Sequence, residues 1–375
     1  MGYDDYLGYL KTNTEINSMK SNRLSPLQRF RSVRYHSANS EYVSEDDVLV
    51  DLKDNSKKLS SFPLLDLEQG YSFDIKQAKI DEFKKLNNVN SLVHALQYDE
   101  DLFYWAFAIL YDSPAAFALI NQVEESGWKF TLDHLDDSGY HLDVADNIII
   151  LNNYGLDIST IGQSNHYRHL FLITLMKSLR DCMHELAGLG IFEHYNAESI
   201  ILLERARTAD IDAITILMAW ELRSAGYHSL WRFMVGSNDG DMAQILLNIM
   251  DRYPTALYNG TALAHVFRQW YVDEQRIDGC DHATLEYLDE FIDEQGFDVG
   301  KKSAKAHDFE SLSLLPDGSS CYLNKLGETV AKDPFFNSFD DPINQAHLFQ
   351  ILYDSEVTYV GDIPFRDAKL AKKFL

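Results

Sequence analysis

Two neighbouring stretches of sequence decide the fold of this chain. They are NHYRHLFLITLMKSLRDCMHELAG, residues 165–188, and AESIILLERARTADIDAITILMAWELRSAG, residues 197–226. In both, apolar residues recur mostly at spacings of three and four, the period of an α-helix with a buried face. Gly188 interrupts the first pattern, Asn196 is a suitable N-cap for the second, and Gly226 is a suitable stop. The sequence therefore predicts two long consecutive helices.

The segments around this helix pair predict a small sheet and further helices. Residues 128–152 contain WKFTLDHL, which alternates in the manner of a half-buried strand, and YHLDVADNIIIL, which supplies a second strand and is long enough for a third. Helical periodicity marks much of 75–125 and recurs between 240 and 295. The predicted fold class is α+β and predominantly helical, with a small antiparallel sheet ahead of the long helix pair and a helical C-terminal half.

Composition limits the classes of partner and the compartment. The 375 residues carry a formal net charge of −25, which disfavours nucleic acid and anionic membranes as partners. A protein or peptide is the partner class that remains, and the oligomeric state is left open. The three cysteines do not suggest a disulfide framework. The sequence shows neither a signal peptide nor an apolar run of membrane-spanning length, so a cytoplasmic protein is expected.

The helix pair also carries a resemblance to a known family. It resembles uncharacterised bacterial proteins described as metallopeptidases of zincin type, in which one helix carries His-Glu-Leu-Arg-His and the next carries Arg-x-x-Glu-Ala-Asp-Ala and then Ala-Trp-Glu-Leu. The framework of these motifs is present at the following positions: Leu175, Leu179, Arg180, Arg205, Ala209, Asp210, Ala219, Trp220, Glu221 and Leu222. The likeness extends from about residue 113 to 323.

The resemblance also implies a domain organisation. Residues 75–300 are predicted to form the zincin-like domain, residues 1–60 a flexible polar N-terminal extension, and residues 301–375 a C-terminal extension that packs on the domain. Four of the retained framework residues would line the substrate or partner groove: Arg180, Arg205, Asp210 and Glu221.

The metal-binding positions of that family are not matched here. In such a site two histidines four residues apart bind zinc, and the glutamate beside the first acts as general base. This chain has Lys177 and Asp181 at the aligned histidine positions and Ser178 in place of the glutamate. Thr208 stands where the next helix would supply the third, acidic ligand. No metal cofactor is therefore expected.

The replaced positions allow two interpretations. Lys177 and Asp181 lie four residues apart, so their side chains can meet on one helix face. If that face is buried, the Lys177 ammonium would occupy the place of the metal cation, balanced by Asp181 and Asp210. The alternative is an ordinary exposed ion pair, worth about a few tenths of a kcal/mol.

Two functional hypotheses follow, and a purely structural or regulatory helical protein is a third. In the first, the chain is an inactive homologue, a pseudoenzyme that keeps the fold and acts as a binding or regulatory protein. In the second, it is an active zinc metallopeptidase or metal hydrolase with rearranged ligands. The candidate ligands would then be His166, His169, Asp181, His184 and Asp210.

Overall fold

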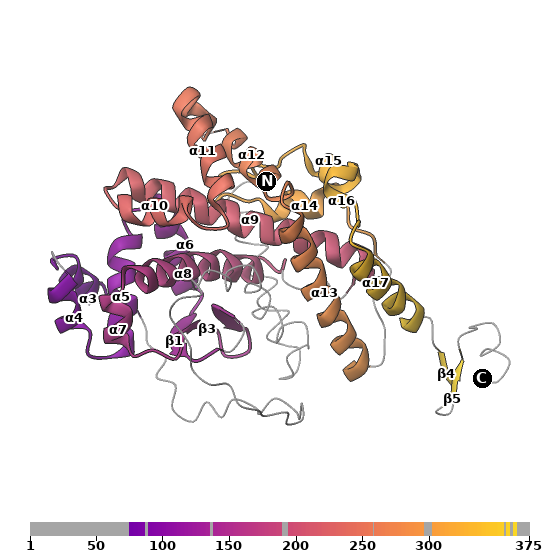
Figure 1. The fold of residues 1–375 in the computed structure, drawn as a ribbon, viewed down its shortest axis with the longest axis horizontal. Helices are drawn as coiled ribbons and strands as arrows, with labels where there is room; N and C mark the ends of the chain where they lie inside the picture. Colours follow the sequence, from indigo (N-terminus) through magenta and orange to yellow (C-terminus); the bar gives the residue numbers. More distant parts are fainter. Residues whose placement is uncertain are drawn as a thin grey trace, which may run out of the picture.

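The structure, a computed structural model, describes residues 75–86, 89–135, 138–189, 194–257, 259–295, 302–355, 358–360 and 363–365. The predicted N-terminal extension, residues 1–60, lies outside these ranges. Within them the fold is α+β and predominantly helical, as predicted (Figure 1). No described helix is long and apolar enough to cross a membrane.

The predicted helix pair is present and lies at the centre of the molecule. Helix α8 covers Asn165–Leu186 and helix α9 covers Ala197–Ser224. The Ser164 side chain accepts from the backbone at the start of α8, and Asn196 does the same at the start of α9, which confirms the predicted cap. Helix α9 runs through the middle of the ribbon and is buried along most of its length (Figure 1). A helix buried on all sides can serve as a common packing surface for the elements around it.

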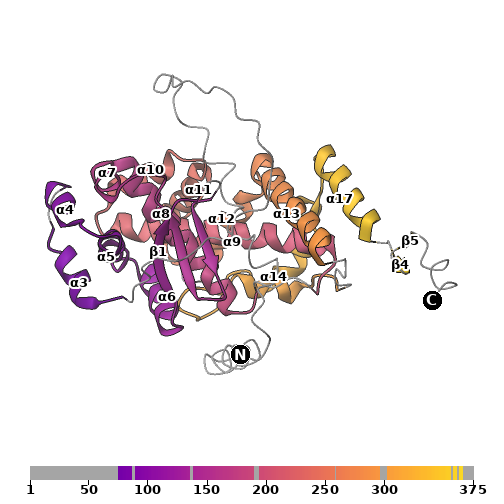
Figure 2. The ribbon, with the colours of Figure 1, turned by 90° about the horizontal axis from the view of Figure 1, so that it is seen from below.

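The elements before α8 form one end of the molecule (Figures 1 and 2). Their bounds are α3 Gln77–Phe83, α4 Val89–Ala95, α5 Asp99–Leu110, α6 Pro114–Glu125, β1 Lys129–Asp133, β2 Tyr140–Asp143, β3 Ile148–Asn152 and α7 Ile158–Gln163. An aromatic cluster joins α5, β1 and α8. Its closest ring pairs are Phe107 with Phe130, at 5.1 Å between centroids, and Phe103 with Phe171, at 5.4 Å.

The sheet differs from the prediction in one respect. It has the order β1-β3-β2, and β2 pairs antiparallel with β3, but β1 pairs parallel with β3. The sheet is therefore mixed, and the expectation of an antiparallel sheet was wrong for its β1 edge. A tight turn joins β2 to β3, with Asp143 Oδ1 accepting from two backbone amides, so this pair must be a hairpin. Alternation identifies a strand, but it does not say which neighbour the strand will pair with.

The elements after α9 cover its other sides. They are α10 His228–Val235, α11 Gly240–Arg252, η2 Pro254–Ala256, α12 Thr261–Trp270, α13 Glu274–Gln295, α14 Ala306–Leu312, α15 Gly327–Lys332, α16 Pro334–Asn337, α17 Pro342–Ser355, β4 Thr358–Val360 and β5 Ile363–Phe365. Helices α10, α11, α12, α13 and α14 all contact α9, and α17 packs along α13. The segment after residue 301 thus reaches the central helix through α14.

Candidate functional site

Charged side chains are buried along both long helices. On α8 these are Arg168, Lys177, Arg180, Asp181 and His184, and on α9 they are Glu204, Arg205, Arg207, Asp210 and Asp212. Taking a charge out of water is costly unless an opposite charge and hydrogen bonds replace the solvent. The partners of these groups therefore determine what the helix pair can do.

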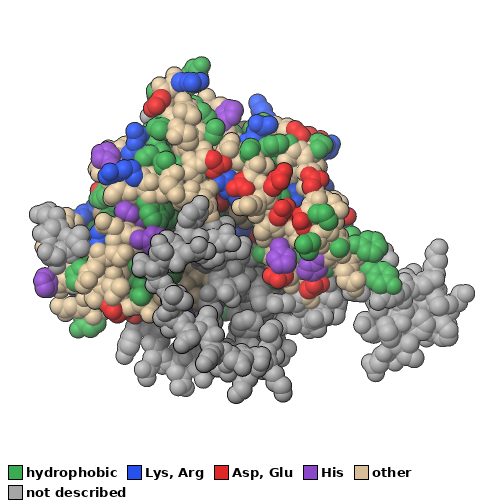
Figure 3. Space-filling view, in the orientation of Figure 1, with side chains coloured by type: hydrophobic (Ala, Val, Ile, Leu, Met, Phe, Trp, Pro, Cys, Tyr) green, Lys and Arg blue, Asp and Glu red, His purple; other side chains and the backbone are tan. Residues whose placement is uncertain are grey.

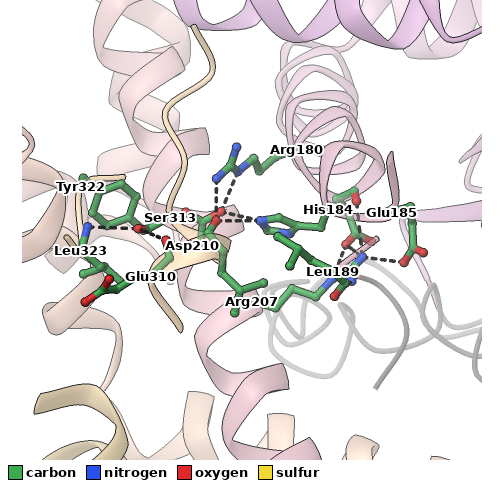
Figure 4. Close-up of polar contacts among 12 residues, drawn as sticks. Arg180, His184, Glu185, Leu189, Arg207, Asp210, Glu310, Ser313, Tyr322 and Leu323 are labelled. Atoms are coloured by element: carbon green, nitrogen blue, oxygen red, sulfur yellow. Dashed lines mark hydrogen bonds and ion pairs between the residues drawn. The ribbon is translucent and has the colours of Figure 1, made fainter. Parts of the chain in front are cut away.

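Asp210 is the centre of the best-connected cluster (Figure 4). Its Oδ2 lies 2.6 Å from Arg180 Nε and 2.9 Å from His184 Nε2, and its Oδ1 accepts from the Tyr322 hydroxyl at 2.8 Å. The Leu312 carbonyl accepts from Arg180 Nη2 at 2.8 Å and lies 3.1 Å from His184 Nε2. The cluster therefore joins α8 and α9 to the segment that follows α14.

The protonation states in this cluster follow from its geometry. Both neighbours of His184 Nε2 are acceptors, so this nitrogen must carry a proton. Burial and the positive charge of Arg180 lower the pKa of His184, and Asp210 offsets this only in part, which favours a neutral ring. Burial alone would raise the pKa of Asp210, but Arg180 and His184 reverse that effect and lower it. Asp210 is therefore a carboxylate that is fully engaged.

Asp181 belongs to a second cluster, built around Arg207. Arg207 Nε donates to Asp181 Oδ1 at 2.7 Å, and its Nη2 donates to Glu185 at 2.8 Å. The Tyr140 hydroxyl donates to the other Asp181 oxygen at 3.1 Å. Burial would lower the pKa of Arg207, but Asp181 and Glu185 more than reverse this and raise it. This cluster links α8 and α9 to strand β2.

Lys177 belongs to a third cluster, which it forms with Asp212 on α9 and Asp239 before α11. Its Nζ lies 2.8 Å from Asp212 Oδ1 and 3.3 Å from Asp239 Oδ2, and Trp270 Nε1 donates to Asp212 Oδ2 at 3.0 Å. Burial would lower the pKa of Lys177, but Asp212 and Asp239 overcome this and raise it. Lys177 is therefore a buried ammonium held between two carboxylates.

The predicted pairing of Lys177 with Asp181 and Asp210 was wrong. Lys177 is buried, as one of the two interpretations required, but its partners are Asp212 and Asp239. Asp181 pairs with Arg207 and Asp210 with Arg180. A spacing of four residues lets two side chains on α8 meet, but charges on neighbouring helices compete for them. The sequence spacing does not reveal those competitors.

Two other aligned positions also lie away from a common centre. The Ser178 hydroxyl is buried and donates to the Leu175 carbonyl of its own helix at 2.9 Å. Thr208 Oγ1 lies 3.7 Å from Cys280 Sγ on α13, so it faces away from α8. The four aligned side chains therefore contact different partners.

The residues predicted to line a groove occupy three separate places. Arg180 and Asp210 contact each other, as described above. Arg205 makes two parallel hydrogen bonds of 2.6 Å to the carboxylate of Asp281 on α13. Glu221 accepts from the Ala115 amide and the Ser113 hydroxyl at the start of α6. Arg205 and Glu221 thus tie α9 to α13 and α6, and they do not face a groove shared with Arg180.

The alternative set of metal ligands is not assembled either. His184 and Asp210 meet, but His166 and His169 precede His184 by 18 and 15 residues on α8, which is about 22 to 27 Å along a helix. Both of these rings pack on Phe233, at centroid distances of 5.4 Å and 5.3 Å. Within the described residues, no group of three or more His, Cys, Asp or Glu side chains is arranged to hold a metal ion.

Several members of the clusters were not singled out from the sequence. They are Arg207, Asp212, Asp239, Asp281 and Tyr322. Two of them, Arg207 and Asp212, lie on α9, and the sequence carried one signal for these two. A charged residue on a buried face of a helix must find a buried partner. The partners outside the pair lie far away in the sequence and carry no comparable signal.

A comparison with known protein families matches the part of the chain that contains both long helices. Residues 161–322 match the model of the "Putative metallopeptidase family". The predicted resemblance to an uncharacterised metallopeptidase family is thereby confirmed for this segment. No curated protein and no solved structure matches the chain.

The side chains at the aligned positions do not fit a zinc ion. Zinc in proteins takes thiolates, neutral imidazoles and carboxylates as ligands. Lys177 is kept as an ammonium by Asp212 and Asp239, and the Ser178 hydroxyl is bound to the backbone. Asp181 is the one aligned side chain with suitable chemistry, and Arg207 and Tyr140 occupy its oxygens.

Proposed function

We propose that this member of a metallopeptidase-type family has lost its zinc site and acts as a non-catalytic binding or regulatory protein. The observation that supports this most is the buried Lys177 ammonium at an aligned ligand position, 2.8 Å from Asp212. A fixed cation bonded to carboxylates supplies positive charge at that position, but it offers neither a Lewis acid nor an activated water.

The hydrogen bonds and ion pairs of the buried carboxylates also support the proposal. A general base needs a free lone pair that points toward a reacting group. Asp181, at an aligned ligand position, and Asp210 each face an arginine and a tyrosine. Such a network stabilises the helix pair and leaves these carboxylates no evident role as bases.

The charge of the surface favours a partner with basic character. Acidic side chains are prominent on the face of the molecule in Figure 3. Burial raises the pKa of Asp278, and its acidic neighbours Asp341 and Glu274 raise it further. Together with the net charge of −25, this favours a basic protein or peptide segment over an acidic one.

The proposal is tested by measuring metal content and peptidase activity on the same untagged preparation. After incubation with zinc and gel filtration, we expect no stoichiometric zinc on the protein. We also expect no chelator-sensitive cleavage of a mixed peptide library. A known zinc peptidase carried through the same procedure serves as the positive control. About one equivalent of bound zinc together with chelator-sensitive cleavage would overturn the proposal.

A variant then tests the alignment of the motif. Lys177→His, Ser178→Glu and Asp181→His together restore the family pattern on α8. If the alignment is correct, this triple variant gains zinc affinity over the wild-type chain. A matched triple variant, with the same three residue types introduced at the exposed positions Gln244, Asn248 and Asp251 of α11, controls for adventitious binding. Equal zinc uptake by the two variants would count against the alignment.

A further inference from the structure

A cleft lies at the other end of the molecule, away from the ion pairs of the helix pair. Its volume is about 400 Å³, within the range of small-molecule sites. The lining comes from α3, α4, α5, the first turn of α8 and the turn before α10, which lie together in Figures 1 and 2. Its apolar walls include Phe83, Leu92, Trp105 and Ile109.

One wall of this cleft carries a buried cation, Arg168, for which the described part of the chain supplies no counter-ion. Arg168 is 8% exposed, and its two Nη atoms donate to the Gly162 carbonyl and to Asn165 Oδ1, both of which are neutral. No acidic side chain among the described residues forms an ion pair with it. Burial lowers the pKa of Arg168, and no neighbouring acid raises it again.

Arg168 is the exception among the buried cations of the described residues. Lys177, Arg180, Arg205 and Arg207 are buried to a similar degree, and each has a carboxylate within 2.8 Å. In a chain with a net charge of −25, acidic partners are not scarce. A buried guanidinium without one, held in position by two neutral acceptors at the edge of a cleft, is a preorganised site for an anion.

The other polar groups of the cleft define the ligand further. Lys84 contributes a second positive charge, and its Nζ lies 5.5 Å above the ring of Tyr111. Asp112 is the one acidic side chain among the described residues of the lining, and the Tyr227 hydroxyl donates to it at 2.9 Å. The charge balance of the lining is thus positive, and the remaining walls are aromatic and aliphatic.

We propose that this cleft binds a carboxylate carried on an aromatic or branched apolar body, with Arg168 as the counter-ion. The carboxylate would take the place of the missing acidic partner of Arg168. The apolar body would lie against Trp105 and Phe83. This site is separate from the helix-pair clusters and does not depend on the function proposed above. A free small acid and the C-terminus of a peptide share the required chemistry.

Calorimetric titration of the full chain tests the proposal with matched probes. The probes are phenylacetate and indole-3-acetate, each compared with its neutral amide. We expect each acid to bind at least about tenfold more tightly than its amide, because a charge-assisted hydrogen bond to the guanidinium is lost in the amide. A short peptide ending in phenylalanine, with a free or an amidated C-terminus, then distinguishes the two sources. Binding of the free form indicates a peptide end, and binding of the small acids alone indicates a metabolite.

Variants test whether Arg168 causes the preference for the acid over its amide. Arg168→Gln should abolish the difference between acid and amide, whereas Arg252→Gln, which removes an exposed charge on α11, should retain it. Trp105→Ala should weaken acid and amide alike. If Arg168→Gln does not fold, Arg168→Lys keeps the charge and should retain a reduced preference. The proposal fails if acid and amide bind equally to the wild-type chain, if no acid binds, or if the preference survives in Arg168→Gln.

Discussion

Arg180 and His184 lie one turn apart on α8, and both contact the same oxygen of Asp210, at 2.6 Å and 2.9 Å. The shared oxygen explains why the two groups differ in charge state. Arg180 supplies the positive charge, and its presence, together with burial, lowers the pKa of His184, so that the ring acts as a neutral donor. One carboxylate thereby holds two side chains of α8 and, through Tyr322, the segment after α14.

Replacing Asp210 with asparagine should destabilise the fold strongly. The amide keeps the shape but removes the carboxylate charge that lies 2.6 Å from the buried Arg180 guanidinium, which costs about 3–5 kcal/mol in free energy of unfolding. Urea denaturation of Asp210→Asn measures the loss. Asp251→Asn, at an exposed position on α11, is the control and should stay within about 0.5 kcal/mol of wild type. Similar values for the two variants would contradict the assigned role of Asp210.

Replacing Lys177 with methionine should remove the buried ammonium that Asp212 and Asp239 share. Asp212 and Asp239 would then repel each other in a site with little solvent, and we expect a loss of about 3–5 kcal/mol. The double variant Lys177→Met, Asp212→Asn should recover part of this loss, because one of the two unpaired charges is removed. A double-mutant cycle in urea measures the coupling. If the effects of the two substitutions on the free energy of unfolding are additive, the ion pair contributes nothing specific to stability.

Stability should fall in mild acid because of His184. The pKa of His184 in the fold lies below its ordinary value of about 6.5 in an unfolded chain, so the unfolded state binds the proton more readily. The contribution of a neutral His184 is complete above about pH 6.5 and is lost as the pH falls toward the lowered pKa of the folded state. Comparing the free energy of unfolding at two pH values, one on each side of 6.5, measures this effect.

The variant His184→Gln isolates that contribution. A glutamine amide can reproduce the Nε2–H donor to Asp210 but does not titrate. The dependence of stability on pH should therefore be weaker in His184→Gln than in wild type. It should not vanish, because burial also lowers the pKa of His141 and His169. The control is His228→Gln, at an exposed position. If the pH dependence of stability changes equally in both variants, His184 is not its cause.

Removing the Tyr322 hydroxyl should loosen the segment after α14. Its bond to Asp210 has a charged acceptor, and such bonds are worth about 1.5–3 kcal/mol. In Tyr322→Phe we expect faster amide hydrogen exchange in residues 312–323 than in α8 or α9, because the segment loses one of its attachments to the helix pair. Tyr253→Phe, at a tyrosine that is 66% exposed, is the control. Unchanged exchange in that segment would show that other contacts hold it.

The local elements of this fold could be predicted well from the sequence. The two long helices, the cap at Asn196 and strands between residues 128 and 152 all occur as expected. The family resemblance is confirmed over residues 161–322. Each of these features depends on residues close together in the chain, such as an apolar period, a capping side chain or a turn, so their physical cause lies within a short window of sequence.

The pairing of these elements and of their charges was decided only by the tertiary structure. The sheet is mixed because β1 reaches the free edge of β3, and Lys177 pairs with Asp212 and Asp239 instead of Asp181. Buried charges must find partners, but which partner is nearest depends on how α8, α9 and the start of α11 pack together. A spacing along one helix describes a single face, whereas an ion pair forms wherever two faces meet. The sequence by itself therefore determined the helices and the likeness of residues 161–322 to that family, and the packing determined which charges became neighbours.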